Sequence, residues 1–145
     1  MTVFSCSETI LINEAREHVY HAAEEYPRFA TFYTAGEILE NTQHAMVVRI
    51  TSTLCGIPIS WRGHGKKTPY DSIEFVQTEG LLKGLTALWT FEDHNRSCRV
   101  TIDSRFSLNV PIIGKLAEHL IGKYKVHATI KMILEALKRR AESAR

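Results

Sequence analysis

The residues of this sequence that could do chemistry on a small molecule are two pairs of basic side chains. Arg62 and His64 flank a glycine directly after Trp61, and Lys123 and His127 stand four residues apart near the C-terminal end. A histidine or a lysine can polarise a carbonyl group or shuttle a proton, provided that a pocket holds the substrate beside it. We take these four residues as candidates for polar contacts with a ligand, and Arg62 and His64 as the candidates for catalysis.

Motifs for metal binding, nucleophilic catalysis and phosphate binding are absent from the sequence. The seven histidines include His18 and His21, three residues apart, but they form no zinc signature. Cys6, Cys55 and Cys98 are odd in number and form no Cys-x-x-Cys pair, and no Gly-x-Ser-x-Gly is present. No glycine-rich stretch is followed by an expected helix, as a phosphate-binding loop would be. We expect neither a metal nor a cofactor.

Length and charge restrict the class of protein. The chain has 145 residues, of which 44% are hydrophobic, which suits a single domain over residues 1–145 with a substantial core. A formal net charge of +2 gives no argument for DNA as a partner. The start of the chain lacks the pattern of a signal peptide, and no apolar run reaches the roughly 18 residues of a transmembrane segment. We therefore expect a cytoplasmic protein whose cysteines are reduced.

Apolar and polar residues alternate over most of the chain, which predicts strands. After a first strand, Asn13 is the expected cap of a helix that Pro27 ends, and a second short helix follows. The strands are expected at residues 4–12, 38–40, 46–54, 59–67, 72–78, 85–91 and 99–108, and the helices at 14–25 and 28–32.

The residues from Pro111 to Ser143 have the pattern of one long amphipathic helix. Lys138, Arg139 and Arg140 lie at its C-terminal end, where the helix dipole favours cations. Its apolar face comprises Ile113, Leu116, Leu120, Tyr124, Ile130, Leu134, Leu137 and Ala141. Two glycines, Lys123 and His127 interrupt the first half of this face. Either Lys123 and His127 are satisfied by structural hydrogen bonds, or this half of the helix faces a cavity.

Strands with one apolar face form an antiparallel sheet that buries one side, and the last helix is the element long enough to cover it. At about 1.5 Å per residue this helix would outrun a flat sheet, so the sheet must curve around it. We expect an α+β fold in which about six or seven antiparallel strands wrap around the C-terminal helix. A cavity between sheet and helix would be lined by Ile50, Ser52, Leu54, Trp61, Phe75, Trp89, Ser104, Phe106, Leu116, Leu120, Lys123, Tyr124 and His127.

The order of elements resembles the helix-grip fold of the START and Bet v 1-like (SRPBCC) superfamily. The chain is most similar to the branch of polyketide cyclases/dehydrases, coenzyme Q-binding proteins and the bacterial ribosome-association toxin. The matching stretches are Ile10-Leu-Ile, Val19-Tyr20, Tyr26-Pro27-Arg28-Phe29, Ile38-Leu39-Glu40, Ile73-Glu-Phe75, the residues from Glu79-Gly80 to Leu85, Trp89-Thr-Phe91 and the closing helix. Ala22 stands where the branch usually carries an acidic residue. The aromatases of this branch present an arginine from the strand that follows the Trp61 position. In this chain only Arg62 or His64 could take its place.

The resemblance implies a lipid-binding START domain with a hydrophobic cavity. Its ligand would be a quinone, an isoprenoid or an aromatic polyketide-like molecule, and the protein would act as a carrier or chaperone. A cyclase or aromatase-like enzyme is the alternative, so whether the protein is an enzyme stays open. A second alternative is an interaction protein of the ribosome-association kind, with a ribosome or a lipid-phase partner. Neither the ligand nor the oligomeric state follows from the sequence.

Overall fold

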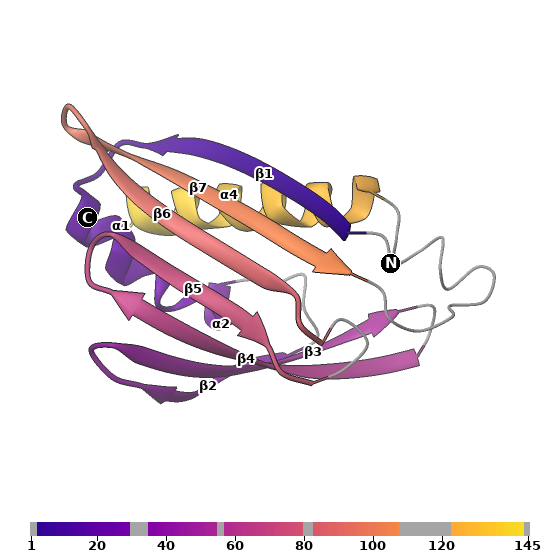
Figure 1. The fold of residues 1–145 in the computed structure, drawn as a ribbon. Coiled ribbons are helices and arrows are strands. Elements are labelled where there is room, and N and C mark those ends of the chain that lie inside the picture. Colours follow the sequence, from indigo (N-terminus) through magenta and orange to yellow (C-terminus); the bar gives the residue numbers. More distant parts are fainter. Residues whose placement is uncertain (1–2, 30–34, 55–56, 80–82, 108–122, 144–145) are drawn as a thin grey trace.

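The fold is one curved antiparallel sheet with three helices against its concave face (Figure 1). The computed structural model describes residues 3–29, 35–54, 57–79, 83–107 and 123–143. The sheet has the strand order β1-β7-β6-β5-β4-β3-β2, so β1 and β2 form its two edges. Neighbouring strands along the chain are paired from β2 to β7, and β7 returns to pair with β1.

The elements follow the order expected from the sequence. The strands are β1 (Val3–Ile12), β2 (Ala35–Asn41), β3 (Ala45–Leu54), β4 (Ile57–Thr68), β5 (Ser72–Gln77), β6 (Thr86–His94) and β7 (Ser97–Ser107). The helices are α1 (Arg16–Ala23), α2 (Tyr26–Phe29) and α4 (Lys123–Ser143). This arrangement confirms the helix-grip fold with two short helices after the first strand. The expected first turns of the C-terminal helix, from Pro111 to residue 122, lie outside the described residues.

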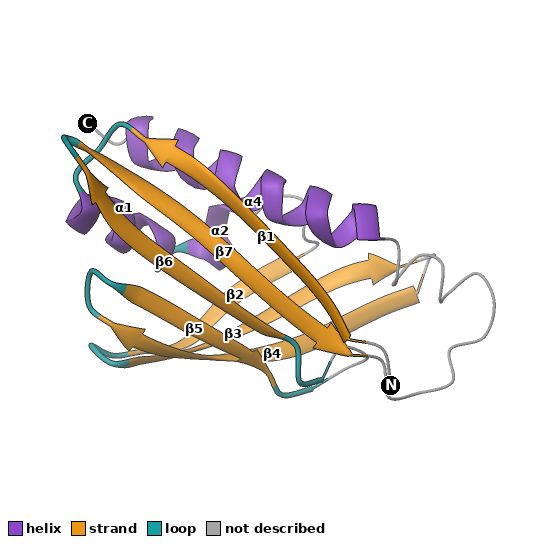
Figure 2. Cartoon of the chain, turned by 45° about the horizontal axis from the view of Figure 1, so that its top comes forward, coloured by secondary structure: helices purple, strands orange, loops and turns teal. Residues whose placement is uncertain are grey.

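Helix α4 packs along β1 and against α1 and α2, as Figures 1 and 2 both show. Its buried face contains Ile130, Ile133, Leu134, Ala136, Leu137 and Ala141. Ile130, Leu134, Leu137 and Ala141 are the residues that the 3.6-residue period predicts. The C-terminal half of the helix is therefore the gripped core element.

Glycines in β4 allow an aromatic ring to pack over the strand. A Cβ atom built on Gly65 would lie 2.8 Å from Cγ of Met46 and 2.9 Å from Cε1 of Phe75. At Gly63 the nearest contact would be 3.3 Å, to Cγ2 of Val48. The side chain of Phe75 thus occupies space that any larger residue at position 65 would take.

Two local predictions about the first helix were wrong. Asn13 does not cap α1, because the helix begins after Ala15 and no side-chain cap is present. The side-chain oxygen of Asn13 instead accepts a hydrogen bond from Oγ of Ser97, 3.1 Å away. Pro27 does not end α1 either; it lies in the first turn of α2, where a proline needs no hydrogen-bonded N–H.

Two turns also differ from the prediction. The strands expected at residues 85–91 and 99–108 are longer at this hairpin, because β6 continues to His94 and β7 begins at Ser97. Only Asn95 and Arg96 form the turn, and Asn95 adopts a positive φ of 59°. The strand expected at residues 59–67 likewise begins earlier, because Ile57 and Pro58 belong to β4.

Candidate functional site

The concave face of the sheet carries rows of side chains that face α4. Residues directly opposite each other in paired antiparallel strands point to the same face, so the registers define these rows. One row runs across Cys6, Ser104, Ala87, Phe75, Gly65 and Met46. The next row consists of Glu8, Ile102, Trp89, Ile73 and Lys67.

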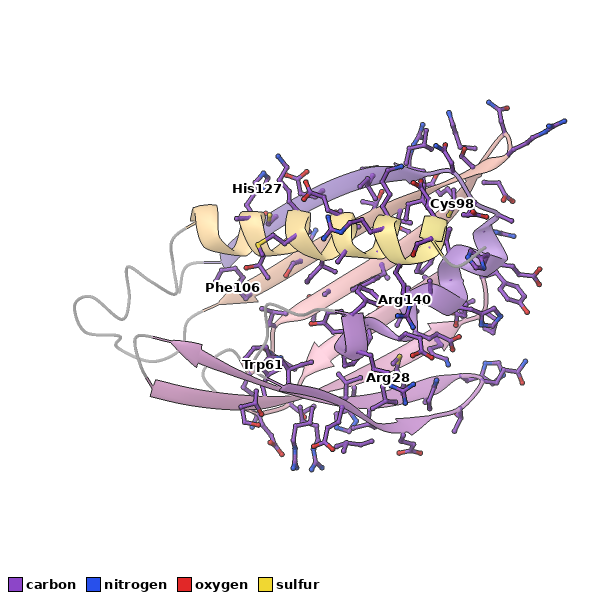
Figure 3. The ribbon with its side chains drawn as sticks, turned by 180° about the vertical axis from the view of Figure 1, so that it is seen from behind. Arg28, Trp61, Cys98, Phe106, His127 and Arg140 are labelled. Atoms are coloured by element: carbon purple, nitrogen blue, oxygen red, sulfur yellow. The ribbon has the colours of Figure 1, made fainter. Side chains whose placement is uncertain are left out.

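Six of the residues proposed from the sequence as lining a cavity belong to this concave face. Ile50, Phe75, Trp89, Ser104 and Phe106 are buried, and Trp61, opposite Ile50 in the register, is partly buried. In Figure 3, Trp61 and Phe106 lie toward the end of the molecule where the described part of α4 begins. The structure thus brings aromatic residues from four strands to one surface.

Ala87 lies near the centre of this face, yet part of its surface stays accessible. Its register neighbours Ser104 and Phe75 are only 4% and 8% exposed. Ala87 itself is only partly buried, although it belongs to the same cross-strand row. Ala87 is thus an accessible position between two buried neighbours of the same row.

Apart from His127, the remaining lining residues either have only their backbone described or lie outside the described residues. Ser52 and Leu54 belong to β3, opposite Ile59 and Ile57, and Lys123 and Tyr124 belong to the first turn of α4. Leu116 and Leu120 lie outside the described residues. Their contact with a ligand stays a prediction.

Arg62 and His64 lie on the convex face of the sheet. They alternate along β4 with Gly63 and Gly65, whose buried positions face Val48 and Phe75 on the concave side. His64 is exposed, and Nε of Arg62 lies 3.9 Å from Oε1 of Glu79. The structure therefore does not bring these two candidates together with the aromatic residues of the concave face.

His127 lies between α4 and the edge strand β1. Its Nδ1 is 3.1 Å from Sγ of Cys6, and its Nε2 pairs with Oε1 of Glu8. The side chain of His127 is 46% exposed, while that of Glu8 is 19% exposed. His127 thus interrupts the apolar face of α4 at a point where β1 offers two polar partners, Cys6 and Glu8.

Cys6 and Glu8 could not be identified from the sequence as partners of His127, because they lie far from it along the chain; Cys6 and His127 are 121 positions apart. A signal was nevertheless present. Glu8 takes the inward position between Cys6 and Ile10 in the alternation of β1, where an apolar residue would be expected.

Lys67 is buried at the other end of the cross-strand row that begins with Glu8. Its Nζ donates to Oε2 of Glu24 and, over 2.6 Å, to Oδ1 of Asn41. Only 2% of its side chain is exposed. Lys67 is therefore not available at the surface, unlike its exposed neighbour Lys66.

Tyr20 packs beside this ion pair. Its ring makes edge contacts with Tyr70 and Phe91, and its buried hydroxyl has no hydrogen-bond partner among the described residues. Burial, and to a lesser degree the charge of Glu24 and the phenol of Tyr70, raises the pKa of Tyr20 to about 12. The hydroxyl therefore stays protonated at neutral pH.

A basic groove of about 680 Å³ lies on the outside of the molecule, between α2 and the C-terminal part of α4. It is lined by Arg28, Phe29, Ala136, Arg139, Arg140, Glu142 and Ser143. Arg28 and Arg140 appear at this side of the molecule in Figure 3. Lys138 is engaged elsewhere, since it donates to Oε2 of Glu142 over 2.6 Å and to the carbonyl oxygen of Leu11 over 3.1 Å.

Within the described ranges, no group of three or more histidine, cysteine, aspartate and glutamate side chains is arranged to hold a metal ion. Among the helices of those same ranges, none has the length and apolar character needed to cross a membrane.

The model of the family described as polyketide cyclase/dehydrase and lipid transport matches residues 18–132. The chain belongs to this family. The match begins in α1 and ends within α4, so in this member of the polyketide cyclase/dehydrase and lipid transport family the matched region contains β2 to β7 and the first part of α4, whereas β1 lies before it.

This family member is similar to one characterised relative and to several solved structures. It is 25% identical over 123 residues to the ribosome association toxin RatA of Rickettsia prowazekii (strain Madrid E), a match that covers 82% of each chain. A structure from Thermus thermophilus superimposes with a TM-score of 0.83 at 19% identity, covering 97% of this chain and 99% of the other.

The Zhui aromatase/cyclase of Streptomyces sp. R1128 matches with a TM-score of 0.80 at 16% identity, over 97% of this chain and 94% of the other. A START superfamily protein of Mycobacterium smegmatis matches with a TM-score of 0.75 at 14% identity, over 97% and 99%. At these identities the structural matches establish the shared fold of the polyketide cyclase/dehydrase and lipid transport family and nothing about the substrate.

Proposed function

We propose that this protein binds a hydrophobic small molecule between the concave face of the sheet and α4, as a carrier or chaperone. The observation that carries the proposal is the accessible surface of Ala87 and Trp61 on an otherwise buried aromatic face. An apolar site with few polar groups suits a quinone, an isoprenoid chain or a polyketide-like ring. Ser104 is the buried hydroxyl in the same row as Ala87.

The basic side chains of β4 are not available for acid-base chemistry on a ligand at the concave face. Lys67 is occupied by Glu24 and Asn41 at the far side of the sheet. Arg62 and His64 lie on the convex face, so the two residues that the sequence offered for a cyclase-type reaction do not reach the proposed ligand. We therefore favour a carrier over the alternative of a cyclase or aromatase-like enzyme.

Extraction of the purified protein with organic solvent, followed by mass spectrometry, tests this proposal. We expect a hydrophobic compound at a stoichiometric amount, absent from a control protein purified in the same way. A protein that yields no compound, and whose tryptophan fluorescence does not respond to short-chain quinones, isoprenoid alcohols or aromatic polyketides, would contradict the proposal.

A second candidate function is association with the ribosome, and the basic groove is the observation that favours it. The similarity to RatA, a ribosome association toxin, brings this possibility to a chain that exposes Arg28, Arg139 and Arg140 around one groove. RNA phosphates bind such guanidinium groups in a salt-dependent manner.

Co-sedimentation with ribosomes tests the second candidate. Reversal of charge in the pair Arg139→Glu and Arg140→Glu should abolish co-sedimentation. The matched control is Arg96→Glu with Arg105→Glu, since both residues are exposed elsewhere on the surface. Equal effects of the two double variants would remove the argument for the groove.

A further inference from the structure

Cys6, His127 and Glu8 form a linear cluster at the boundary between β1 and α4. The thiol lies 3.1 Å from Nδ1 of the imidazole, and the carboxylate pairs with Nε2 on the opposite side of the ring. Cys6 and Glu8 are two residues apart in β1 and therefore point to the same face. One ring thus bridges a thiol and a carboxylate through its two nitrogens.

This order of groups favours proton transfer from the thiol. A hydrogen on Nε2 is held by the carboxylate of Glu8, which leaves Nδ1 with the lone pair that accepts the proton of Sγ. After the transfer, the charge on the imidazolium is stabilised by the carboxylate on one side and the thiolate on the other. A nucleophile, a base and a group that orients the base are the three parts that activate a weak nucleophile.

The cluster borders the proposed ligand space and is reachable from solvent. Cys6 is partly buried and stands opposite Ser104 in the register of β1 and β7. His127 is exposed and appears in Figure 3 on the same end of the molecule as Phe106. A small electrophile can therefore approach Sγ without unfolding of the sheet.

Cys98 provides a contrast within the same molecule. It is 0% exposed at the beginning of β7, and burial, followed by the charge of Asp93, raises the pKa of its thiol to about 11. Among the described residues, one thiol thus lies beside a base, and another is kept protonated and inaccessible.

We propose that Cys6 is a nucleophile that adds to α,β-unsaturated carbonyl compounds, with His127 as the base and Glu8 as the residue that positions it. Sγ forms a bond to the β-carbon, and the π electrons of the C=C bond move onto the carbonyl oxygen as an enolate. The proton taken up by Nδ1 of His127 then passes to the α-carbon. The product is a thioether that contains every atom of the electrophile, so neither an oxidant nor a leaving group is required.

N-ethylmaleimide, an α,β-unsaturated imide, is the probe for this site, because it needs no hydrophobic cavity. The folded protein is treated at pH 7, and the rate of addition at each cysteine is measured by peptide mass mapping. We expect Cys6 to react at least about 5-fold faster than glutathione, whose thiol is only a few per cent ionised at this pH. Cys98 should react only after unfolding.

Variants of His127 and Glu8 distinguish a Cys6 thiol that these residues activate from a thiol that is merely exposed. His127→Asn opens more space beside Sγ, so greater access would speed the addition at Cys6, whereas loss of the base should slow it at least about 5-fold. Glu8→Gln keeps a hydrogen-bond acceptor for Nε2 but removes the charge, and it should also slow the addition. Thermal unfolding of each variant confirms that the fold is retained.

Equal rates at Cys6 in the wild type and in Glu8→Gln would overturn the proposal, as would a rate in His127→Asn that equals or exceeds the wild-type rate. These results do not depend on the hydrophobic ligand. A protein that yields no extracted lipid can still show the activated thiol, and a lipid carrier can still lack it.

Discussion

The buried pair of Lys67 and Glu24 is the side-chain contact from which we expect the largest effect on stability. Replacing Lys67 by Met keeps the apolar stem but leaves the carboxylate of Glu24 partly buried without its main cation. Breaking a buried pair in this way typically costs about 3 to 5 kcal/mol. Urea unfolding should therefore show a loss of about 3 kcal/mol in the free energy of unfolding of Lys67→Met.

The matched control for this change is Lys66→Met, since Lys66 is the exposed neighbour on the same strand. Its effect should stay within about 0.5 kcal/mol. Similar losses in the two variants would show that the ion pair does not stabilise the fold.

Tyr20 gives a prediction about alkaline pH. The pKa of its phenol is raised from 10.0 to about 12, so between these values the native state holds a proton that the unfolded chain has released. Native stability must then fall as pH rises through this window. Tyr20→Phe removes this group, so its unfolding midpoint in an alkaline titration followed by circular dichroism should move to higher pH.

At pH 7 the same substitution should leave stability unchanged or increase it by up to about 1 kcal/mol, because the buried hydroxyl has no partner among the described residues. An unchanged alkaline midpoint in Tyr20→Phe would contradict the assigned environment of this phenol.

Single residues were harder to place from the sequence than the faces to which they belong. The alternation of β4 puts Gly63, Gly65 and Lys67 on one side. Nothing local shows that Glu24, at the C-cap of α1, and Asn41 of β2 would reach Lys67. Likewise, the helical pattern shows His127 among apolar residues without revealing Cys6 and Glu8. Such partners depend on contacts between distant segments, which periodicity does not encode.

At the scale of elements, the close contact between β4 and β5 gives a further prediction. Gly65→Ala would place a Cβ atom 2.8 Å from Met46 and 2.9 Å from Phe75, so these side chains must shift. Overpacking of this kind costs about 1 to 3 kcal/mol, which a urea titration measures as a lower unfolding midpoint.

Gly63→Ala is the comparison on the same strand, because its Cβ atom would lie 3.3 Å from Cγ2 of Val48 and 3.9 Å from Cδ1 of Phe75. It should be less destabilising than Gly65→Ala, because its closest contact is 3.3 Å rather than 2.8 Å, while the restriction of the unfolded chain by alanine is the same in both variants. A larger loss at position 63 than at position 65 would contradict the described packing of Phe75 over β4.

Elements were predicted well where a whole pattern specifies them and poorly where one residue does. Strict alternation identified β7 to within two residues of its start, and the apolar stripe from Ile130 to Ala141 identified the buried face of α4. The cap at Asn13 was wrong because its side chain is used by Ser97 at the neighbouring strand end. A capping residue can find a tertiary partner instead, and local sequence gives no sign of it.

At the scale of the whole molecule, the fold gives one sheet face two different packing environments. Toward the C-terminal half of α4, residues such as Leu137 and Ala23 are fully buried. Toward the other end, Ala87 and Trp61 keep accessible surface on the same concave side. The central claim is that this second region holds a hydrophobic ligand, whereas the first is a filled core.

A matched pair of alanine-to-leucine substitutions tests this claim most directly. Stability is measured by urea unfolding of ligand-free protein, and bound compound by solvent extraction and mass spectrometry. Ala23→Leu should destabilise by about 1 to 3 kcal/mol through overpacking, whereas Ala87→Leu should change stability by less than about 1 kcal/mol. Ala87→Leu should nevertheless lose the extracted compound, because leucine fills its space. If Ala87→Leu is as destabilising as Ala23→Leu, and the amount of bound compound is unchanged, the interior is filled and the account is contradicted.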